Sequence, residues 1–228
     1  MSDGELFDPA SLRGRSRRTA FVRTAEQPTL VLGSTQDAGV IDPRALESRG
    51  VALKRRRSGG GAVLVVPGAT VWIDTWIPRG DPLWDDDVSR SRLWTGQWWL
   101  RALADAGTGA ALSVWVGRPE STPWSSLICF AGVDVGEVVV GRRKLVGVSQ
   151  WRAKQGSLTH AFAYDRVDWE ATTALLAASA GSHDAIDQLE ASTVTLGDLG
   201  LDPRARAVDL LIAQLPGPEP WDIEVSLG

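Results

Sequence analysis

Three consecutive glycines, Gly59 to Gly61, directly follow a basic run and directly precede an apolar one. The segment 54–63 reads Lys-Arg-Arg-Arg-Ser-Gly-Gly-Gly-Ala-Val, and we call it the glycine loop. Glycine has no Cβ and reaches positive φ, so the backbone amides of such a triplet approach a ligand closely. Arginine binds phosphate and carboxylate through paired hydrogen bonds. The loop therefore indicates an anion-binding turn between two strands; the alternative is a glycine turn beside a solvated basic patch.

The same segment excludes two common phosphate-binding motifs. No Gly-Lys-Ser or Gly-Lys-Thr follows the glycines, so it is not a Walker A loop, and the glycines lack the spacing of a dinucleotide-binding fingerprint. In an extended strand, alternate side chains point to opposite sides. Lys54 therefore shares a side with Arg56, while Arg55 and Arg57 point the other way. The four cations cannot all contact one ligand.

Composition excludes several classes of function. The net charge of −4 argues against a general nucleic-acid binder, and no apolar run approaches the roughly 20 residues of a membrane helix. Two histidines and one cysteine are too few for a convincing zinc site, so we expect no metal-ligating residues. A single cysteine forms no internal disulfide and fits a reducing cytoplasm, which is the compartment that we expect.

Local patterns predict the elements around the glycine loop. Asp42 is expected to cap a helix over residues 43–49, and Asp85 to Asp87 to open the longest helix, over 85–106. Residues 62–66 and 70–77 are predicted as an antiparallel pair joined across Pro67-Gly68. The other predicted strands are 29–33, 51–57, 112–116, 126–130 and 137–140, and the other predicted helices are 168–176, 182–190 and 203–215.

Tryptophan is unusually frequent, with 11 residues against one tyrosine. Most are expected to pack in the core, and a few could line an apolar tunnel. Asp74 lies between Trp72 and Trp76 on one face of the predicted strand 70–77. Two interpretations of Asp74 stay open: a polar group that faces a ligand, or a charge on an edge strand that deters aggregation.

Three segments carry a resemblance to one family. Arg-Arg-Arg-Ser-Gly-Gly-Gly-Ala-Val resembles the loop of lipoate–protein ligases, which are related to biotin ligases and octanoyltransferases. Residues 141–150, Gly-Arg-Arg-Lys-Leu-Val-Gly-Val-Ser-Gln, resemble the family's lysine motif. Residues 156–161 resemble its Gly-x-x-x-His-Gly segment, with Ala161 in place of the last glycine. The resemblance spans residues 28–215, nearly the whole chain.

The resemblance implies an α/β (α+β) fold like the biotin/lipoate ligase catalytic domain. Such a domain has a mixed, mainly antiparallel sheet flanked by helices. We expect residues 19–228 to form it as a single domain, since 228 residues suffice for one large core. Residues 1–18 are polar and basic, and we expect them to be a flexible N-terminal segment.

The resemblance also assigns roles to residues. Lys144 matches the family's essential lysine, whose ammonium neutralises charge at the reacting carbonyl. Without the resemblance, Arg142-Arg143-Lys144 reads as an ordinary basic hairpin, and His160 as a structural histidine. With it, the residues that bind the substrate or adenylate are Arg56, Ser58, Gly59, Gly60, Gly61, Ala62, Gly147 and His160.

Cys129 bears on the choice of reaction. It lies 15 positions before Lys144 (144 − 129), and one cysteine-dependent branch of octanoyltransferases resembles this, with Cys-Phe at a similar separation. Two neighbouring antiparallel strands would place the lysine ammonium beside the thiol, where it would stabilise the thiolate. The alternative is a small buried apolar side chain without a chemical role.

Two reactions therefore compete. A ligase forms lipoyl-adenylate from ATP, whereas an octanoyltransferase moves the acyl group from acyl carrier protein onto a cysteine. The chain departs from standard ligases, with Val65-Val66 in place of His-Asp, Gly68-Ala69 in place of Gly-Asn, and only Asp134 near the place of an Asn-Asp pair. It departs from the cysteine branch at the third glycine of the loop.

Our first hypothesis is a lipoate–protein ligase-like enzyme that transfers lipoyl or octanoyl to a lysine of a lipoyl domain through an acyl-adenylate, with ATP and Mg²⁺. The alternative is an ATP-independent octanoyltransferase without a cofactor, with Cys129 as nucleophile and octanoyl-acyl carrier protein as donor. A non-catalytic binder of acyl groups or adenylates is the third. The expected partners are lipoate or octanoate, acyl carrier protein, and lipoyl domains of 2-oxoacid dehydrogenase or glycine-cleavage proteins, with no nucleic acid or membrane.

Overall fold

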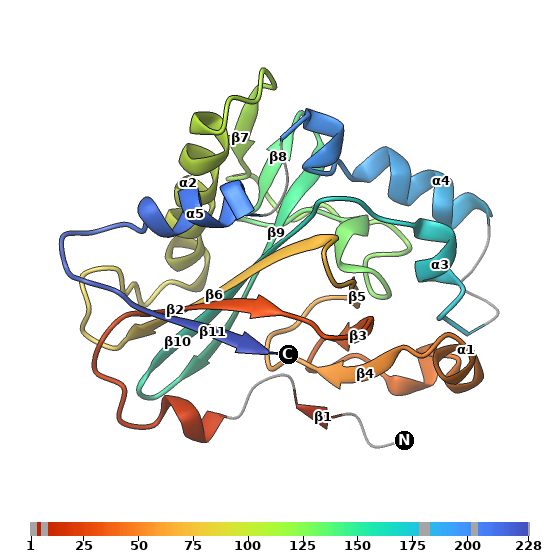
Figure 1. Cartoon of the computed structure of the whole chain (residues 1–228), viewed down its shortest axis with the longest axis horizontal. Helices are drawn as coiled ribbons and strands as arrows, with labels where there is room; N and C mark the ends of the chain where they lie inside the picture. Colours follow the sequence, from red (N-terminus) through yellow and green to blue (C-terminus); the bar gives the residue numbers. More distant parts are fainter. Residues whose placement is uncertain (1–3, 6–8, 178–182, 202–204, 228) are drawn as a thin grey trace.

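The computed structural model describes residues 4–5, 9–177, 183–201 and 205–227, which form two sheets and their covering helices (Figure 1). The large sheet has seven strands in the order β11-β2-β6-β10-β9-β8-β7. All of its neighbours are antiparallel except β11 and β2. The strands are β2 (Thr19–Thr24), β6 (Thr70–Pro78), β7 (Leu112–Val114), β8 (Val138–Val140), β9 (Arg143–Ala153), β10 (Gly156–Tyr164) and β11 (Asp222–Leu227).

The small sheet has four strands in the order β1-β4-β3-β5. Its neighbours β1–β4 and β4–β3 are parallel, and β3–β5 are antiparallel. The strands are β1 (Gly4–Glu5), β3 (Thr29–Leu32), β4 (Ala52–Arg55) and β5 (Val63–Val65). Because β4 enters the glycine loop and β5 leaves it, this sheet holds both ends of the loop. The expected α/β (α+β) fold, with a mixed, mainly antiparallel sheet flanked by helices, is confirmed.

Side-chain capping starts the two helices that the sequence predicted most directly. Asp42 accepts hydrogen bonds from Arg44 N and Ala45 N before α1 (Pro43–Ser48), and Asp87 caps α2 (Val88–Asp105) in the same way. The remaining helices are α3 (Trp169–Thr173), α4 (His183–Ser192) and α5 (Ala205–Ala213). Residues 182 and 203, where two predicted helices begin, lie outside the described residues. No described helix is long and apolar enough to cross a membrane.

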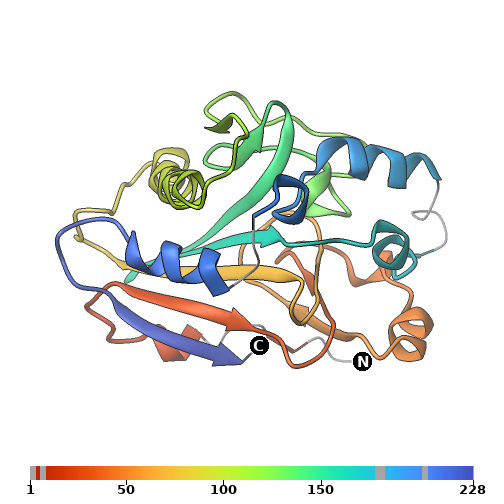
Figure 2. The same ribbon diagram turned by 45° about the horizontal axis from the view of Figure 1, so that its top comes forward.

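The two faces of the large sheet are covered differently. On one face α2 and α5 bury Trp98 and Trp99, and Trp98 Nε1 donates a hydrogen bond to Leu211 O at 2.7 Å. Both views place α2 and α5 together, with α1, α3 and α4 at the other end of the molecule (Figure 1, Figure 2). Strand alternation sends Phe162 and Tyr164 of β10 to the opposite face, against the small sheet.

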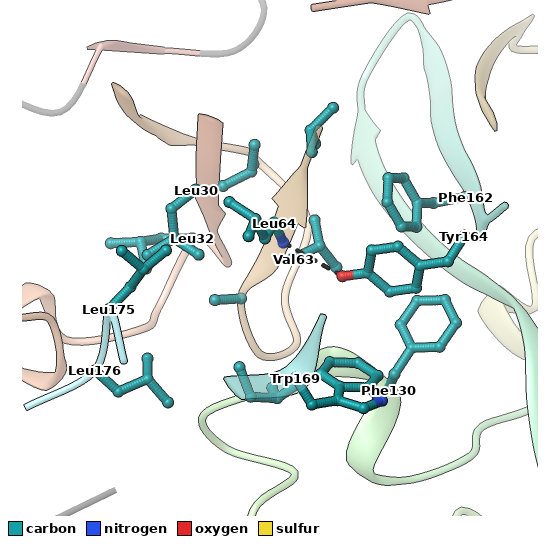
Figure 3. Close-up of a cluster of buried hydrophobic side chains, with 14 of the residues drawn as sticks. Leu30, Leu32, Val63, Leu64, Phe130, Phe162, Tyr164, Trp169, Leu175 and Leu176 are labelled. Atoms are coloured by element: carbon teal, nitrogen blue, oxygen red, sulfur yellow. Dashed lines mark hydrogen bonds between the residues drawn. The ribbon is translucent and has the colours of Figure 1, made fainter. Parts of the chain in front are cut away.

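An aromatic cluster joins the two sheets. Phe130, Phe162 and Tyr164 pack together, with ring centroids 4.8 to 5.9 Å apart, and face Leu64 of β5 (Figure 3). Tyr164 Oη accepts a hydrogen bond from Leu64 N at 3.3 Å. Burial, the main cause, raises the pKa of Tyr164 well above its usual range, so the phenol stays neutral. This cluster fixes the small sheet and its glycine loop over the large sheet.

Two expectations about strands are wrong, and one of the two open interpretations of Asp74 is excluded. Residues 62–66 and 70–77 do not pair: β5 pairs with β3 in the small sheet, whereas β6 lies between β2 and β10 in the large one. The chain changes sheets at Pro67-Gly68, where Gly68 has φ of 75°. Because β6 is an internal strand, Asp74 is not an edge charge. Residues 126–130 form no strand; a short 3₁₀ helix, η3 (Cys129–Ala131), occupies that place.

The predicted flexible segment 1–18 lies partly outside the described residues, at 1–3 and 6–8. In its described part, the 3₁₀ helix η1 (Pro9–Leu12) buries Leu12 against the large sheet. Arg18 is also buried, and its Nε lies 2.7 Å from Asp81 Oδ2. These contacts attach residues 9–18 to the domain.

Candidate active site

The guanidinium of Arg56 shapes the glycine loop. The side chain is buried, and its Nη2 donates hydrogen bonds to Gly59 O and Gly61 O, both at 2.8 Å. A further bond reaches Val31 O, at 3.3 Å, in β3. The sequence assigned Arg56 to substrate binding, and the structure shows these donors bonded to main-chain carbonyls. Arg56 therefore holds the turn of the loop in which Gly59 and Gly60 are exposed and Gly61 is buried.

The other end of the loop places Cys129. Ala62 N donates to Leu127 O at 2.7 Å, and Cys129 N donates to Ala62 O at 3.0 Å, so Ala62 is bridged to the segment before η3. A Cβ built on Gly60 would lie 3.8 Å from Cys129 Sγ. Ser58 Oγ lies 2.8 Å from Ser149 Oγ and ties the loop to β9. The bridge explains why residues 126–130 form no strand: they pair with the loop at one position only.

A cleft of about 430 Å³ opens beside the loop. Its walls come from the glycine loop, η3, the turn before β8, the start of α2 and strand β9. The cleft brings together five of the residues that the sequence analysis assigns to a site: Gly59, Gly60, Gly61, Cys129 and Lys144. A second pocket of about 20 Å³ also reaches Cys129, and is lined by Arg56, Val63, Trp72, Phe130, Gly147, Val148, Ser149, His160 and Phe162. Cys129 therefore lines both cavities, as do Val148 and Ser149.

Lys144 is held by an acid that the sequence analysis missed. Lys144 Nζ lies 2.9 Å from Glu137 Oε1, 2.8 Å from Glu137 Oε2 and 2.7 Å from Cys129 O. Both side chains are about 3% exposed. Burial raises the pKa of Glu137, and the charge of Lys144 opposes that shift. The sequence held one signal for this ion pair. Glu137 directly precedes the apolar run Val138-Val139-Val140, and a carboxylate next to a buried strand needs a cation as partner.

The charged lining of the cleft is acidic overall. Its two cations, Arg92 and Lys144, are each paired with a carboxylate, and Arg92 Nη1 lies 2.7 Å from Asp134 Oδ2. Burial favours the neutral form of Asp134, but the hydrogen bond and charge of Arg92 outweigh it and lower its pKa. A third acid, Glu120, also lines the cleft and pairs with Arg142.

His160 lies behind the cleft in a buried polar network. His160 Nδ1 is 2.7 Å from Asp74 Oδ1, and Arg23 Nε donates to Asp74 Oδ2 at 2.7 Å. Trp72 Nε1 donates to Asp74 Oδ1 at 2.5 Å. Burial alone would raise the pKa of Asp74, but His160 and Arg23 outweigh it and lower the pKa to about 2. Asp74 is fully buried and lines neither cavity, so it does not face a ligand directly; it contacts the site through His160.

Replacing Asp74 by asparagine is expected to cost about 3–5 kcal/mol of stability at pH 7, because Arg23 loses its buried counter-ion. The pKa of Asp74 is lower in the folded chain than its ordinary 3.8, so its ionisation stabilises the fold above that value. The difference in free energy of unfolding between the wild type and Asp74→Asn should therefore decrease as the pH falls from about 4 towards 2. Urea unfolding at several pH values measures it.

The matched control is Asp85→Asn, which removes a surface carboxylate paired with the exposed Arg90. It should change stability little at any pH. An Asp74→Asn variant as stable as the wild type at pH 7 would show that the network contributes nothing to the fold.

Comparison with known proteins agrees with the fold. Residues 9–204 match the family model described as the lipoyl protein ligase A/B catalytic domain. The chain is 32% identical over 179 residues to the octanoyltransferase LipM of Kyrpidia tusciae, an alignment that covers 77% of this chain. The chain spans 65% of the length of that relative.

Solved structures share the fold at low identity. Lipoate-protein ligase A bound with ATP superposes with a TM-score of 0.66 and 18% identity, over 86% of this chain and 70% of the other. A bi-partite lipoate protein ligase from Thermoplasma acidophilum, described with its E2 lipoyl domain, superposes with a TM-score of 0.64 and 16% identity. The match covers 91% of this chain and 74% of the other.

The two-sheet fold and its cleft therefore define a catalytic domain of the lipoate ligase kind. The chain belongs to the lipoyl protein ligase A/B catalytic-domain family. The resemblance inferred from the glycine loop and the lysine motif is confirmed.

Proposed function

We propose that the protein transfers an acyl group, octanoyl or lipoyl, to a lysine amine of a lipoyl domain through a thioester on Cys129. The observation that carries this proposal is the position of Cys129, which lines the cleft together with Gly59 to Gly61 and Lys144. Its main-chain oxygen is bonded by Lys144, so the lysine holds the cysteine at the cleft wall. The alternative of an apolar side chain without a role does not explain this placement.

The chemistry needs two acyl transfers. The Cys129 thiolate attacks the carbonyl carbon of a donor thioester, and the donor thiolate leaves. The neutral lysine amine of the lipoyl domain then attacks the new thioester, the bond from carbon to Cys129 sulfur breaks, and the departing thiolate takes up the proton that the amine loses as the amide forms. The glycine loop would hold the donor through its backbone amides, because the Arg56 donors are already bonded to Gly59 O and Gly61 O.

The donor and acceptor follow from this chemistry. The cysteine route requires an acyl thioester as donor, for which we propose octanoyl-acyl carrier protein, and the relative at 32% identity is named an octanoyltransferase. A lipoyl domain is the acceptor, in line with the neighbour described with its E2 lipoyl domain. A free thiol at Cys129 suits the reducing cytoplasm, where we place the protein.

The ATP-dependent ligase is the second candidate. The third glycine of the loop, Gly61, favours it, because the resemblance to the cysteine branch fails at that position. The charged lining does not fit a triphosphate, however. Among the described residues of the cleft wall, Arg92 and Lys144 are both paired, and three carboxylates lie beside them. We therefore prefer acyl transfer through Cys129 to the ATP-dependent reaction.

Intact-mass spectrometry after incubation with octanoyl-acyl carrier protein tests the proposal. The wild type should gain one octanoyl group, and Cys129→Ser should gain none, because the hydroxyl is a far weaker nucleophile at neutral pH. The octanoyl group should then pass to an added lipoyl domain without ATP. Modification of the lipoyl domain that needs ATP and lipoate and survives Cys129→Ser would replace this proposal by the ligase.

A further inference from the structure

Cys129 must lose its proton before it attacks a thioester, and Lys144 is not placed to accept that proton. Two oxygens of Glu137 and the main-chain oxygen of Cys129 surround Lys144 Nζ at 2.7 to 2.9 Å. An ammonium has three N–H bonds and no acceptor capacity. Two of these contacts are hydrogen bonds, to Glu137 Oε1 and Cys129 O, and Glu137 Oε2 lies at 2.8 Å within the ion pair. The proton acceptor must therefore come from another side chain.

His160 presents an unused nitrogen beside Cys129. Its Nε2 is buried and has no hydrogen-bond partner among the described residues. His160 and Cys129 line the same pocket of about 20 Å³, which has room for about one water molecule. Proton transfer between the two side chains is therefore within reach, directly or through one water.

The neighbours of His160 determine which of its nitrogens holds the proton. Asp74 carries a lowered pKa of about 2, so it is ionised at neutral pH and only accepts hydrogen bonds. His160 Nδ1 therefore donates its N–H to Asp74 Oδ1, and in the neutral imidazole the lone pair lies on Nε2. The other charged groups that face this network are Arg23, which neutralises Asp74 from β2, and Arg56, which lines the pocket from the glycine loop.

We propose that His160 Nε2 is the base that takes the thiol proton of Cys129, and that Asp74 is the positioning residue that holds the imidazole in the required tautomer. The S–H bond breaks and the proton moves to Nε2. The thiolate then attacks the donor carbonyl, the carbon–sulfur bond of the donor breaks, and the departing thiolate takes the proton from the imidazolium. This inference rests on the acyl transfer proposed above, and it assigns Lys144 a holding role.

Alkylation of Cys129 by iodoacetamide tests the pair without any acyl donor. The rate should be followed by intact mass from pH 5.5 to 9.5 in the wild type and in His160→Asn. Asparagine keeps an amide N–H near the Nδ1 position and removes Nε2. Alkylation at pH 7 should slow about tenfold, with its pH profile displaced to higher pH, because the thiol loses its proton acceptor. Profiles that superimpose would overturn the assignment.

The protein offers a matched control in its second histidine. His183 is exposed at the start of α4, and His183→Asn should leave the alkylation profile unchanged. In the acylation assay, His160→Asn should form the octanoyl adduct about 100-fold more slowly than the wild type, and His183→Asn at the wild-type rate. If the wild type shows the expected alkylation profile but never forms the octanoyl adduct, the proposed function is wrong and the pairing of Cys129 with His160 is still supported.

A measurement on the wild-type chain tests the same pair without relying on correct folding of His160→Asn. With ¹⁵N-labelled histidine only two imidazoles are observed, from His160 and His183. Blocking Cys129 with iodoacetamide should shift the Nε2 resonance of His160 and leave the resonances of His183 unchanged. An unaffected His160 resonance would show that Nε2 does not face the thiol and would overturn the proposal.

Discussion

Lys144→Ala is expected to lower acyl transfer to a lipoyl domain at least about 100-fold and to destabilise the fold by about 3–5 kcal/mol. Two physical effects combine. The ammonium that holds the main-chain oxygen of Cys129 disappears, so the nucleophile loses its fixed place at the cleft wall. Glu137 also stays buried with no counter-ion. Urea unfolding measures the stability change, and intact mass of an added lipoyl domain measures the transfer.

The stability deficit should depend on pH. Burial already raises the pKa of Glu137 in the presence of Lys144, and loss of the cation should raise it further. A carboxyl with a raised pKa in the folded state is protonated there more readily than in the unfolded chain, so acid favours the fold. The deficit of Lys144→Ala should therefore shrink as the pH falls from 7 towards 5.

A paired variant separates stability from chemistry. Lys144→Met with Glu137→Gln removes both charges and keeps similar volumes, so the fold should recover most of its stability. Acyl transfer should stay low, because no cation then holds Cys129 O. If the paired variant transfers octanoyl at the wild-type rate, Lys144 serves only to neutralise Glu137.

Gly61→Ala is the second change with a large expected effect. A Cβ at Gly61 would lie 2.6 and 2.7 Å from the backbone C and N of Ile128 and 2.8 Å from Cys129 N. Backbone atoms cannot move aside as a flexible side chain does, so the loop and η3 must separate. We expect a loss of about 1–3 kcal/mol, a melting temperature several degrees lower, and near-complete loss of adduct at Cys129.

Gly59→Ala is the matched control two residues away in the same triplet. A Cβ at Gly59 would meet nothing within 4 Å, and its φ is not in the left-handed region. The variant should fold with wild-type stability, as thermal unfolding followed by circular dichroism will show. Equal melting temperatures for both variants would contradict the close approach of the loop and the η3 segment.

Local chemistry explains what the sequence predicted well. Asp42 and Asp87 cap α1 and α2 because a carboxylate before a helix bonds the first free amides, whatever lies elsewhere in the chain. The glycine triplet and the lysine motif identified the family, because their residue order is specific over several consecutive positions. These features need no information about distant residues.

Strand partners were predicted less well. Every residue of β5 and β6 is buried, so neither strand has the polar and apolar alternation that would assign it to one face or one partner. A turn dipeptide at Pro67-Gly68 suits a hairpin and a crossing between sheets equally well. The segment 126–130 is mainly apolar, as a buried strand would be, yet it forms only a single bridge, between Ile128 and Ala62, instead of a strand.

The sequence by itself determined the family and the starts of α1 and α2, and it predicted a site at the glycine loop and Lys144, since each depends on residues close together in the chain. Only the tertiary structure decided which groups face one another. Asp74 and His160 lie 86 positions apart and meet because β6 and β10 are neighbours in register. Cys129 contacts Lys144 from η3, and Glu137 contacts it from the turn before β8. Such pairings depend on sheet order, and sheet order results from burial of whole faces rather than from any local pattern.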